Sequence, residues 1–246
     1  MTAIVRKALV TGATSGIGRA IAEALAAQGA HVLLTGRDEK RGEAVAATIR
    51  AAHGRGDFMG ADLAAAASVA DLARHSERIL GGVDILVNNA GVFSFGPAID
   101  ATEAMFDVMY ATNVKAPLLL TAHLAPGMVR RRWGRIINIT TMAAHIGLPG
   151  AAVYGSSKAA LQLLTQVWAA ELGPSGITSN AIAPGPVKTP GTAAMGDALE
   201  QLAKTLPAGR AGRPEEIAAA VVFLASEGAA FINGATLAVD GGRVAV

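Results

Sequence analysis

The sequence predicts a doubly wound α/β fold, in which a seven-stranded parallel sheet carries helices on both faces. Short β-rich apolar runs alternate with longer segments of helical spacing along the whole chain, which is typical of successive βα units. The runs Ile85-Leu86-Val87 and Ile136-Ile137 are apolar at every position, as in strands that helices cover on both sides. A glycine-rich turn joins the first strand to the first helix. Together these features predict the Rossmann arrangement.

The elements follow in order along the chain. A strand over residues 7–11 leads through the glycine turn to a helix over residues 17–28, where Ile17, Ile21 and Leu25 recur at helical spacing. The later strands are expected over residues 31–35, 57–60, 83–88, 135–140, 177–183 and 235–239, and the later helices over residues 38–53, 65–80, 101–132, 151–172 and 214–226. Seven strands therefore alternate with six helices in one domain over residues 1–246.

An irregular segment follows the sixth strand. Residues 184–191 read PGPVKTPG, and residues 192–206 form a small, mostly apolar helix candidate between Gly191 and Pro207. Ligands of open parallel sheets bind at the carboxyl ends of the strands. We therefore expect a small substrate lid at about residues 186–207.

Composition excludes several classes of function. The 246 residues are 52% hydrophobic and 16% charged, with a net charge of +2 and no cysteine, so neither disorder nor a nucleic-acid surface is indicated. No apolar stretch reaches the ~20 residues of a membrane span. The five histidines lack metal-ligand spacing. We expect a cytoplasmic protein with no metal, membrane or nucleic-acid partner.

The first turn has the chemistry of a phosphate site. Glycines let backbone N–H groups approach a pyrophosphate, and the following helix N-terminus adds partial positive charge. The spacing is G-x-x-x-G-x-G, which differs from the commoner G-x-G-x-x-G. The alternative to a phosphate site is an ordinary tight turn between strand and helix. The candidate cofactor-binding residues here are Gly12, Thr14, Ser15, Gly16, Ile17 and Gly18.

The end of the second strand bears on the choice of dinucleotide. An acidic residue there accepts a hydrogen bond from the ribose 2′-OH of NAD, but this strand ends in Gly36-Arg37. Arg37 is suited to a 2′-phosphate through charge-assisted hydrogen bonds. This favours NADP(H), with NAD(H) as the alternative. The competing interpretation is that Arg37 only begins a charged helix and is neutralised by Asp38.

Tyr154 and Lys158 form the second group of candidate functional residues. Residues at i and i+4 share one face of a helix, so the ammonium lies near the phenol. A nearby cation lowers the pKa of a phenol toward neutrality. Tyr154 thereby becomes a usable acid and base.

Several motifs in order resemble the short-chain dehydrogenase/reductase family over nearly the whole chain, including its 3-oxoacyl reductases. They are the turn from Thr11 to Gly18, Asp62-Leu63, Asn88-Asn89-Ala90-Gly91, Asn113, Tyr154-x-x-x-Lys158, and Pro184-Gly185 with Thr189. The resemblance implies an oxidoreductase that acts on CH–OH groups with NAD(P) as acceptor.

The resemblance also implies roles for individual residues. Tyr154 would be the general acid or base, Lys158 would lower its pKa and bond the nicotinamide ribose, and Asn113 would hold a water molecule. Dinucleotide contacts are implied for Asp62, Leu63, Asn89, Ala90, Gly91, Pro184, Gly185, Val187 and Thr189.

Two positions depart from the family pattern. The family's catalytic serine lies thirteen positions before the tyrosine, where this chain has Thr141. A threonine hydroxyl donates the same hydrogen bond, but its methyl group stiffens χ1 and fills part of the site. Ser15 stands where many NADP-using relatives carry a second basic residue.

The expected substrate is a small ketone or secondary alcohol of apolar or weakly polar character. Apolar residues are expected around the nicotinamide: Phe93, Phe95, Met142, Ile146, Leu148, Met195 and Leu199. One alternative is a reductase of carrier-linked 3-oxoacyl thioesters, with Arg130-Arg131-Arg132 as a docking patch. Another is a non-catalytic dinucleotide sensor. Broad apolar helix faces and the family resemblance favour a homotetramer.

Overall fold

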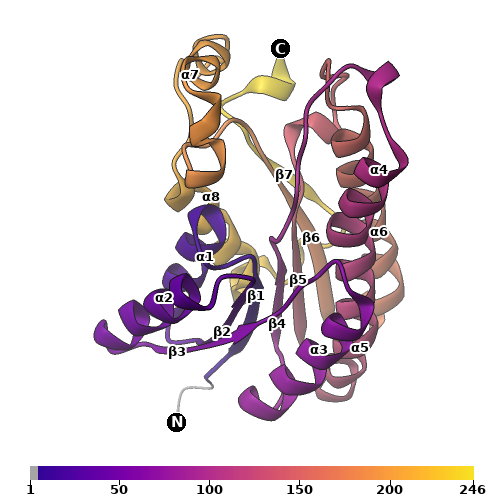
Figure 1. Cartoon of the computed structure of the whole chain (residues 1–246). Helices are drawn as coiled ribbons and strands as arrows, with labels where there is room; N and C mark the ends of the chain where they lie inside the picture. Colours follow the sequence, from indigo (N-terminus) through magenta and orange to yellow (C-terminus); the bar gives the residue numbers. More distant parts are fainter. Residues whose placement is uncertain (1–4) are drawn as a thin grey trace.

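The computed structural model describes residues 5–246 and contains one parallel sheet in the order β3-β2-β1-β4-β5-β6-β7. The doubly wound fold is therefore confirmed (Figure 1). In chain order the strands are β1 (Lys7–Thr11), β2 (His31–Gly36), β3 (Arg55–Gly60), β4 (Ile85–Asn88), β5 (Gly134–Ile139), β6 (Ile177–Pro184) and β7 (Thr236–Val239).

Helices cover both faces of the sheet, as the all-apolar strands predict. One layer packs an apolar core of α1, α2 and α8 against the sheet, and the other packs α3, α5 and α6 (Figure 1). The helices are α1 (Gly16–Ala27), α2 (Glu39–Ala51), α3 (Ala66–Leu80), α4 (Glu103–Tyr110), α5 (Ala116–Arg131), α6 (Ala152–Leu172), α7 (Asp197–Lys204) and α8 (Pro214–Ala225).

The helix expected over residues 101–132 differs from the prediction in its interior. It begins at α4, whose N-cap Thr102 accepts a hydrogen bond from the Met105 N–H, and it ends where Arg132 turns to φ +52°. Between α4 and α5 the chain makes one π-helical turn, Ala111–Lys115. Such a turn inserts an extra residue into the helix. It therefore rotates the following residues relative to a regular α-helix.

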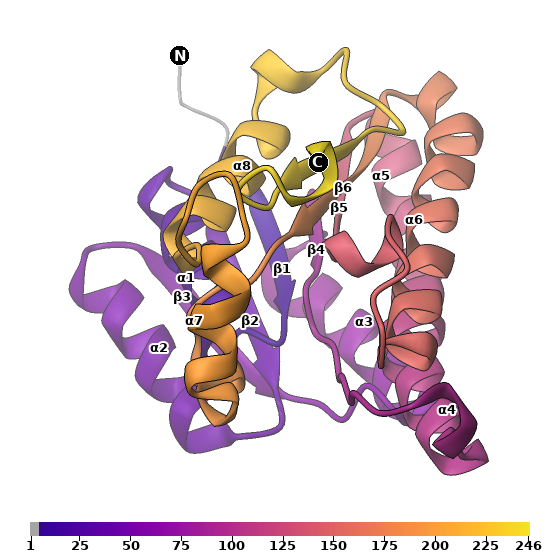
Figure 2. The same cartoon turned by 90° about the horizontal axis from the view of Figure 1, so that it is seen from above.

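The segment after β6 is also more divided than expected. Residues Pro190–Met195 form a 3₁₀ helix, and Gly196 at φ +48° separates it from α7. The chain enters this segment at residues 186–189 and leaves it at residues 210–216, and we call these two stretches its stem. They pair through a bridge between Val187 and Gly212. Seen from the carboxyl edge of the sheet, α7 lies on one side and α4 with α6 on the other (Figure 2).

The carboxyl ends of the central strands lie at this edge of the sheet (Figure 2). The strand order reverses between β1 and β4, which is the usual binding position in an open α/β sheet. Within residues 5–246, none of the helices combines the length and the apolar character that a membrane crossing requires.

Candidate active site

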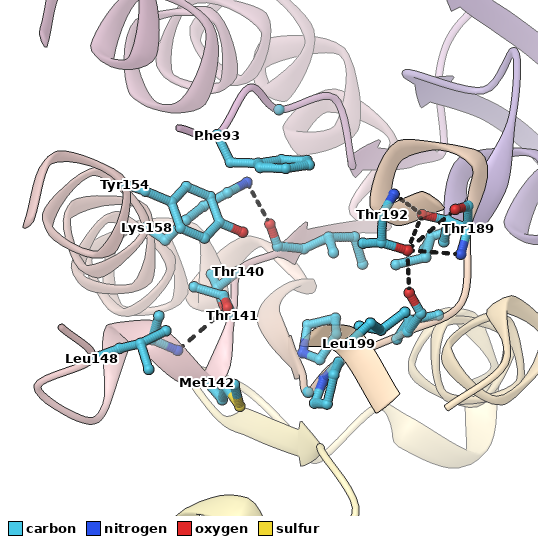
Figure 3. A pocket seen from close by; sticks show the side chains of 18 of the residues that line it. Phe93, Thr140, Thr141, Met142, Leu148, Tyr154, Lys158, Thr189, Thr192 and Leu199 are labelled. Atoms are coloured by element: carbon cyan, nitrogen blue, oxygen red, sulfur yellow. Dashed lines mark hydrogen bonds between the residues drawn. The ribbon is translucent and has the colours of Figure 1, made fainter. Parts of the chain in front are cut away.

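A cavity of about 230 Å³ lies at the carboxyl edge of the sheet. Side chains from the ends of β4, β5 and β6, from α6 and from the α7 segment line it (Figure 3). Lys158 is the only charged residue among the lining residues. Of the apolar residues expected here, Ile146 alone does not line the cavity. The cavity is thus apolar, with a small polar cluster in one wall.

Tyr154 and Lys158 lie one turn apart on α6, as the spacing predicts. Figure 3 shows both side chains pointing toward the cavity from the same helix. The Lys158 Nζ donates a hydrogen bond to the Ile139 carbonyl at 2.9 Å, and the residue is only 3% exposed. The helix therefore holds an amine behind the phenol and ties it to the end of β5.

The pKa shifts in this cluster differ from the expectation that Lys158 lowers the pKa of the Tyr154 phenol. Burial raises the pKa of Tyr154, and a hydrogen bond from the Thr141 side chain acts in the opposite direction. Burial lowers the pKa of Lys158 to about 8. The cause is desolvation, which disfavours whichever form is charged. In this structure Tyr154 is therefore in its neutral, protonated form at pH 7.

Thr141 follows β5 and is buried beside Tyr154. Its Oγ1 accepts a hydrogen bond from the Ala143 N–H at 3.3 Å. Its single hydroxyl proton is directed at Tyr154 in this structure and can rotate to an acceptor placed in the cavity. The threonine thus supplies a donor at the position where the family pattern has serine.

Asn113 lies in the π-helical turn and is completely buried behind the cavity. Its side chain pairs with both the N–H and the carbonyl of Val92 at 2.9 Å, and its Nδ2 donates to Ser157 Oγ at 3.0 Å. Ser157 in turn donates to the Tyr154 carbonyl at 2.7 Å. Asn113 therefore joins the loop after β4 to the helix that carries Tyr154.

The glycine turn packs too closely for side chains. A Cβ on Gly18 would lie 2.2 Å from the Gly12 carbonyl oxygen, and a Cβ on Gly12 would lie 2.8 Å from Ala90 Cα. Gly12 and Gly16 have φ of +64° and +54°, which favours glycine. Ser15 is the N-cap of α1, and its side chain makes no capping hydrogen bond. The turn thus presents backbone N–H groups at a helix N-terminus, which fits a pyrophosphate.

The segment after β4 is fixed against this turn. Asn89 Nδ2 donates to the carbonyls of Thr11 and Gly12 at 2.8 and 3.2 Å. The N–H groups of Asn89 and Ala90 both donate to Thr11 Oγ1 at 3.0 Å. A Cβ on Gly91 would lie 3.2 Å from the Lys158 Nζ. The Asn-Ala-Gly motif therefore connects the glycine turn to the polar cluster.

Arg37, Asp62 and Leu63 lie away from the cavity, at the ends of β2 and β3. Arg37 is exposed, and Asp38 pairs with Arg41 at 2.7 Å rather than with Arg37. Asp62 accepts a hydrogen bond from the Ala64 N–H at 3.1 Å, while Leu63 is buried. Neutralisation of Arg37 by Asp38 is thus not what the structure shows.

The stem of the α7 segment approaches the glycine turn from the other side. A Cβ on Gly16 would lie 3.2 Å from Thr189 Cβ. Thr189 and Thr192 cap each other, and Thr192 Oγ1 donates to the Val187 carbonyl at 2.8 Å (Figure 3). At the end of β6, a Cβ on Gly185 would lie 2.7 Å from Asp240 Cα.

The fold gathers some expected residues around the cavity and leaves others outside it. The expected site residues that line it are Ile17, Asn89, Gly91, Thr141, Tyr154, Lys158, Pro184, Gly185, Val187 and Thr189. Sequence reasoning missed Ser157 and Thr192. The order Thr189-Pro190-x-Thr192, with proline at the first helical position, could have indicated the capping pair. No local pattern indicates Ser157.

Comparisons with known proteins find relatives that match nearly the whole chain. A family model described as Enoyl-(Acyl carrier protein) reductase matches residues 12–243. The 3-oxoacyl-[acyl-carrier-protein] reductase of Pseudomonas aeruginosa is 40% identical over 96% of each chain. A solved structure described as a short chain dehydrogenase/reductase family protein is 50% identical over 98% of each chain, with a TM-score of 0.91.

A second solved structure carries a dinucleotide. It comes from Beutenbergia cavernae and is described as an NAD(P)-dependent gluconate 5-dehydrogenase with bound NADP at low occupancy. It is 38% identical to this chain, covers 98% of it and 97% of its own length, and has a TM-score of 0.93.

Proposed function

Because the chain belongs to the short-chain dehydrogenase/reductase family, we propose that it is an NADP(H)-dependent reductase of apolar or weakly polar ketones and a dehydrogenase of the corresponding secondary alcohols. As a member of that family, the chain is an oxidoreductase that uses a nicotinamide dinucleotide and a small-molecule substrate. The NADP preference, the substrate character and the residue roles are the proposal.

One observation carries the proposal. The phenol of Tyr154 faces an apolar cavity with the Thr141 hydroxyl beside it and the Lys158 amine behind it. A carbonyl oxygen placed between the two hydroxyl groups receives two hydrogen bonds. Preorganised donors of this kind stabilise the negative charge that develops on the oxygen in the transition state.

The glycine turn fits the pyrophosphate of the dinucleotide, because its N–H groups and the α1 N-terminus are free of side-chain caps. We assign contacts with the adenine to Asp62 and Leu63, and further contacts with the dinucleotide to Asn89, Ala90 and Gly91. The remaining contacts we assign to the β6 end and the lid stem are Pro184, Gly185, Val187 and Thr189.

When bound, the reduced dinucleotide supplies a hydride to the carbonyl carbon. Tyr154 donates its proton to the carbonyl oxygen, which suits a phenol that burial keeps protonated. The protonated Lys158 then stabilises the phenolate that remains. Asn113 holds the loop at Val92, and we assign it the further task of binding a water molecule that returns protons to Lys158.

Two features favour NADP over NAD. A Cβ at Gly36 would lie 2.6 Å from Thr14 Cγ2, so the acidic residue that reads the ribose of NAD has no room there. Arg37 is exposed next to this position. A charge-assisted contact to a 2′-phosphate contributes about 1.5–3 kcal/mol. Arg37→Ala is therefore expected to raise KM for NADPH by about one to two decades and to leave NADH nearly unchanged. Equal losses for both cofactors would show that Arg37 does not read the phosphate.

A second candidate is a reductase of 3-oxoacyl thioesters, which the relative from Pseudomonas aeruginosa favours. The expected docking patch is weaker in the structure, because Arg131 pairs with Asp84 at 3.2 Å and donates to the Val83 carbonyl. Arg130 and Arg132 are exposed.

A screen of cofactor consumption tests these proposals together. It compares simple ketones, 3-oxoacyl thioesters, sugars and steroids with NADPH and NADH. Faster turnover of simple ketones with NADPH agrees with the first proposal, and a preference for thioesters supports the second candidate. Dinucleotide binding without turnover of any substrate supports the sensor alternative.

A further inference from the structure

The segment that follows Gly91 carries two phenylalanines into the cavity wall. Residues 91–97 form neither helix nor strand, yet the segment is held at two points. Asn113 pairs with both backbone groups of Val92 at 2.9 Å, and the Gly96 N–H donates to the Gly150 carbonyl at 3.0 Å. Phe93 and Phe95 lie between these two attachments. Their backbone is therefore fixed without any ligand.

The two rings meet the Tyr154 ring in a three-membered aromatic cluster. The ring centroids of Phe93 and Phe95 lie 6.0 Å apart, and each lies about as far from Tyr154, at 6.1 and 5.8 Å. The planes of Phe93 and Phe95 meet that of Tyr154 at 61° and 70°. Edge-to-face geometry of this kind is the favoured arrangement of aromatic pairs. The cluster thus places two aromatic rings next to the phenol that we assign as proton donor.

These rings are not used to build the core. Phe93 is 45% exposed and Phe95 is 47% exposed, and both line the cavity. Figure 3 shows Phe93 beside Tyr154 on one side of the cavity, with Thr189 and Thr192 on the other. A flat apolar group next to the phenol would cover ring surface that is otherwise open to water.

The remaining walls near the rings are also apolar. They come from Met142, Leu148, Met195 and Leu199. Methionine sulfur makes favourable contacts with aromatic rings. No lining side chain other than Lys158 carries a charge, and we assign Lys158 to Tyr154, so no further cation lines the cavity to pair with a carboxylate or phosphate on the substrate.

We propose that Phe93 and Phe95 form an aryl-binding wall, and that the preferred substrates are ketones whose carbonyl carbon bears an aromatic ring, together with the corresponding alcohols. This inference rests on the proposed function, since it places the ring next to a carbonyl held by Tyr154. The ketone gains one hydride and one proton, as in the proposed reaction, and no further reactant is needed.

A matched pair of ketones tests the aryl-binding wall. Acetophenone and cyclohexyl methyl ketone have the same heavy-atom skeleton, but only the first carries an aromatic ring. Conjugation makes the aryl ketone the less reactive of the two, so a preference for it has to come from binding. We expect kcat/KM for acetophenone to exceed that for the cyclohexyl ketone by about tenfold, since two ring contacts each contribute about two- to tenfold.

Three variants locate the preference. Phe93→Leu and Phe95→Leu are each expected to lower the ratio of the two kcat/KM values by about two- to tenfold. Phe223→Leu is the matched control, because Phe223 is also 47% exposed but lies on α8 and does not line the cavity. Equal kcat/KM for the two ketones, or the same fall in the ratio for Phe223→Leu, would overturn the aryl-binding wall.

A binding measurement tests the aryl-binding wall independently of the proposed function. Tyr154→Phe keeps an aromatic ring at its position, and its affinity for 1-phenylethanol and 1-cyclohexylethanol with NADP⁺ is measured by ligand-observed NMR. Tighter binding of the phenyl alcohol supports the wall, and equal binding overturns it, whether or not the native protein turns over ketones. Absence of turnover for every ketone overturns the proposed function alone.

Discussion

At the scale of single residues, we propose that Thr141 is the second hydrogen-bond donor to the carbonyl oxygen. If its hydroxyl polarises the carbonyl, Thr141→Val removes the donor with little change of shape and is expected to lower kcat by about one to three decades. Thr141→Ser keeps the donor and is expected to retain activity. If Thr141 only packs at the end of β5, Thr141→Val is nearly silent. Steady-state kinetics of both variants on one ketone decide between these roles.

Lys158 illustrates the cost of placing a catalytic cation in a buried site. Burial lowers its pKa from 10.5 to about 8, so at pH 7 the protonated form costs roughly 3 kcal/mol relative to the unfolded chain. Lys158→Met removes this cost. The free energy of unfolding is expected to rise by about 1–3 kcal/mol at pH 7 while turnover is lost.

The pH dependence of that difference has a definite sign. Between pH 8 and 10.5 the unfolded chain binds the Lys158 proton and the folded chain does not, so the stability of the native protein rises with pH. The advantage of Lys158→Met is therefore expected to shrink from pH 7 to pH 9.5 in urea unfolding. Lys115→Met, a change at an exposed lysine, is the control. A constant difference for Lys158→Met would contradict the burial of a cation.

Sequence reasoning reached some of these residues and not others for a physical reason. Tyr154 and Lys158 belong to one helix, so their spacing alone places them together. Ser157 belongs to the site because it accepts a hydrogen bond from Asn113, which is 44 residues earlier in the chain. The raised pKa of Tyr154 depends on how far the fold removes the phenol from solvent. Neither the hydrogen bond nor the burial can be predicted from the spacing of residues along the sequence.

At the scale of elements, the segment 186–207 is our proposed lid, and its stem is its point of attachment. Arg210 donates twice to the Glu216 carboxylate, at 2.9 and 2.6 Å, and the Arg213 N–H donates to it at 2.8 Å. The hydrogen bond from Arg210 and then that from Arg213 lower the pKa of Glu216 to about 2. The stabilisation by this pair is therefore present at neutral pH and is lost as the pH falls from 4.5 through about 2.

Glu216→Gln is expected to weaken the stem without touching the cavity. Amide hydrogen exchange over residues 186–212 is expected to become several-fold faster, because local opening costs less free energy. KM for the ketone is expected to rise as well, because the segment that lines the cavity is then held less firmly. Glu215→Gln is the matched control, since Glu215 is in no ion pair within the part of the chain that the structure describes. Unchanged exchange in Glu216→Gln would contradict the assignment of the stem.

The elements themselves were predictable almost throughout. All seven strands and the six main helices were predicted within two residues of their observed ends, because apolar period and flanking glycine or proline mark them. The π-helical turn at Ala111–Lys115 was not predicted. A single inserted residue shifts the helical period too little to be read from one sequence.

At the scale of the whole molecule, we propose a homotetramer built through α4, α5 and α6. These helices leave large apolar side chains between 36% and 62% exposed: Phe106, Val108, Leu118, Val129, Leu163 and Val167. Exposed apolar surface of this kind marks protein–protein contacts. Light scattering at micromolar concentration is expected to give the mass of four chains, or failing that of two. A monomer would contradict the proposal.

A paired substitution on α6 tests whether that face is the contact. Leu163 and Val167 lie one turn apart, so glutamates at both positions place two charges on the same face. This pair is expected to lower the mass in solution. Ile79→Glu on α3, where the side chain is 39% exposed, is expected to leave the mass unchanged.

The account as a whole depends on Tyr154 as the proton donor in a dinucleotide-dependent ketone reduction. The most direct test is single-turnover oxidation of NADPH with a ketone in Tyr154→Phe, alongside the dissociation constant for NADPH. The phenol acts on the proton in the transition state and contributes little to dinucleotide binding. We expect an unchanged dissociation constant and a rate lower by about two to four decades. A variant that oxidises NADPH as fast as the native protein would contradict the account.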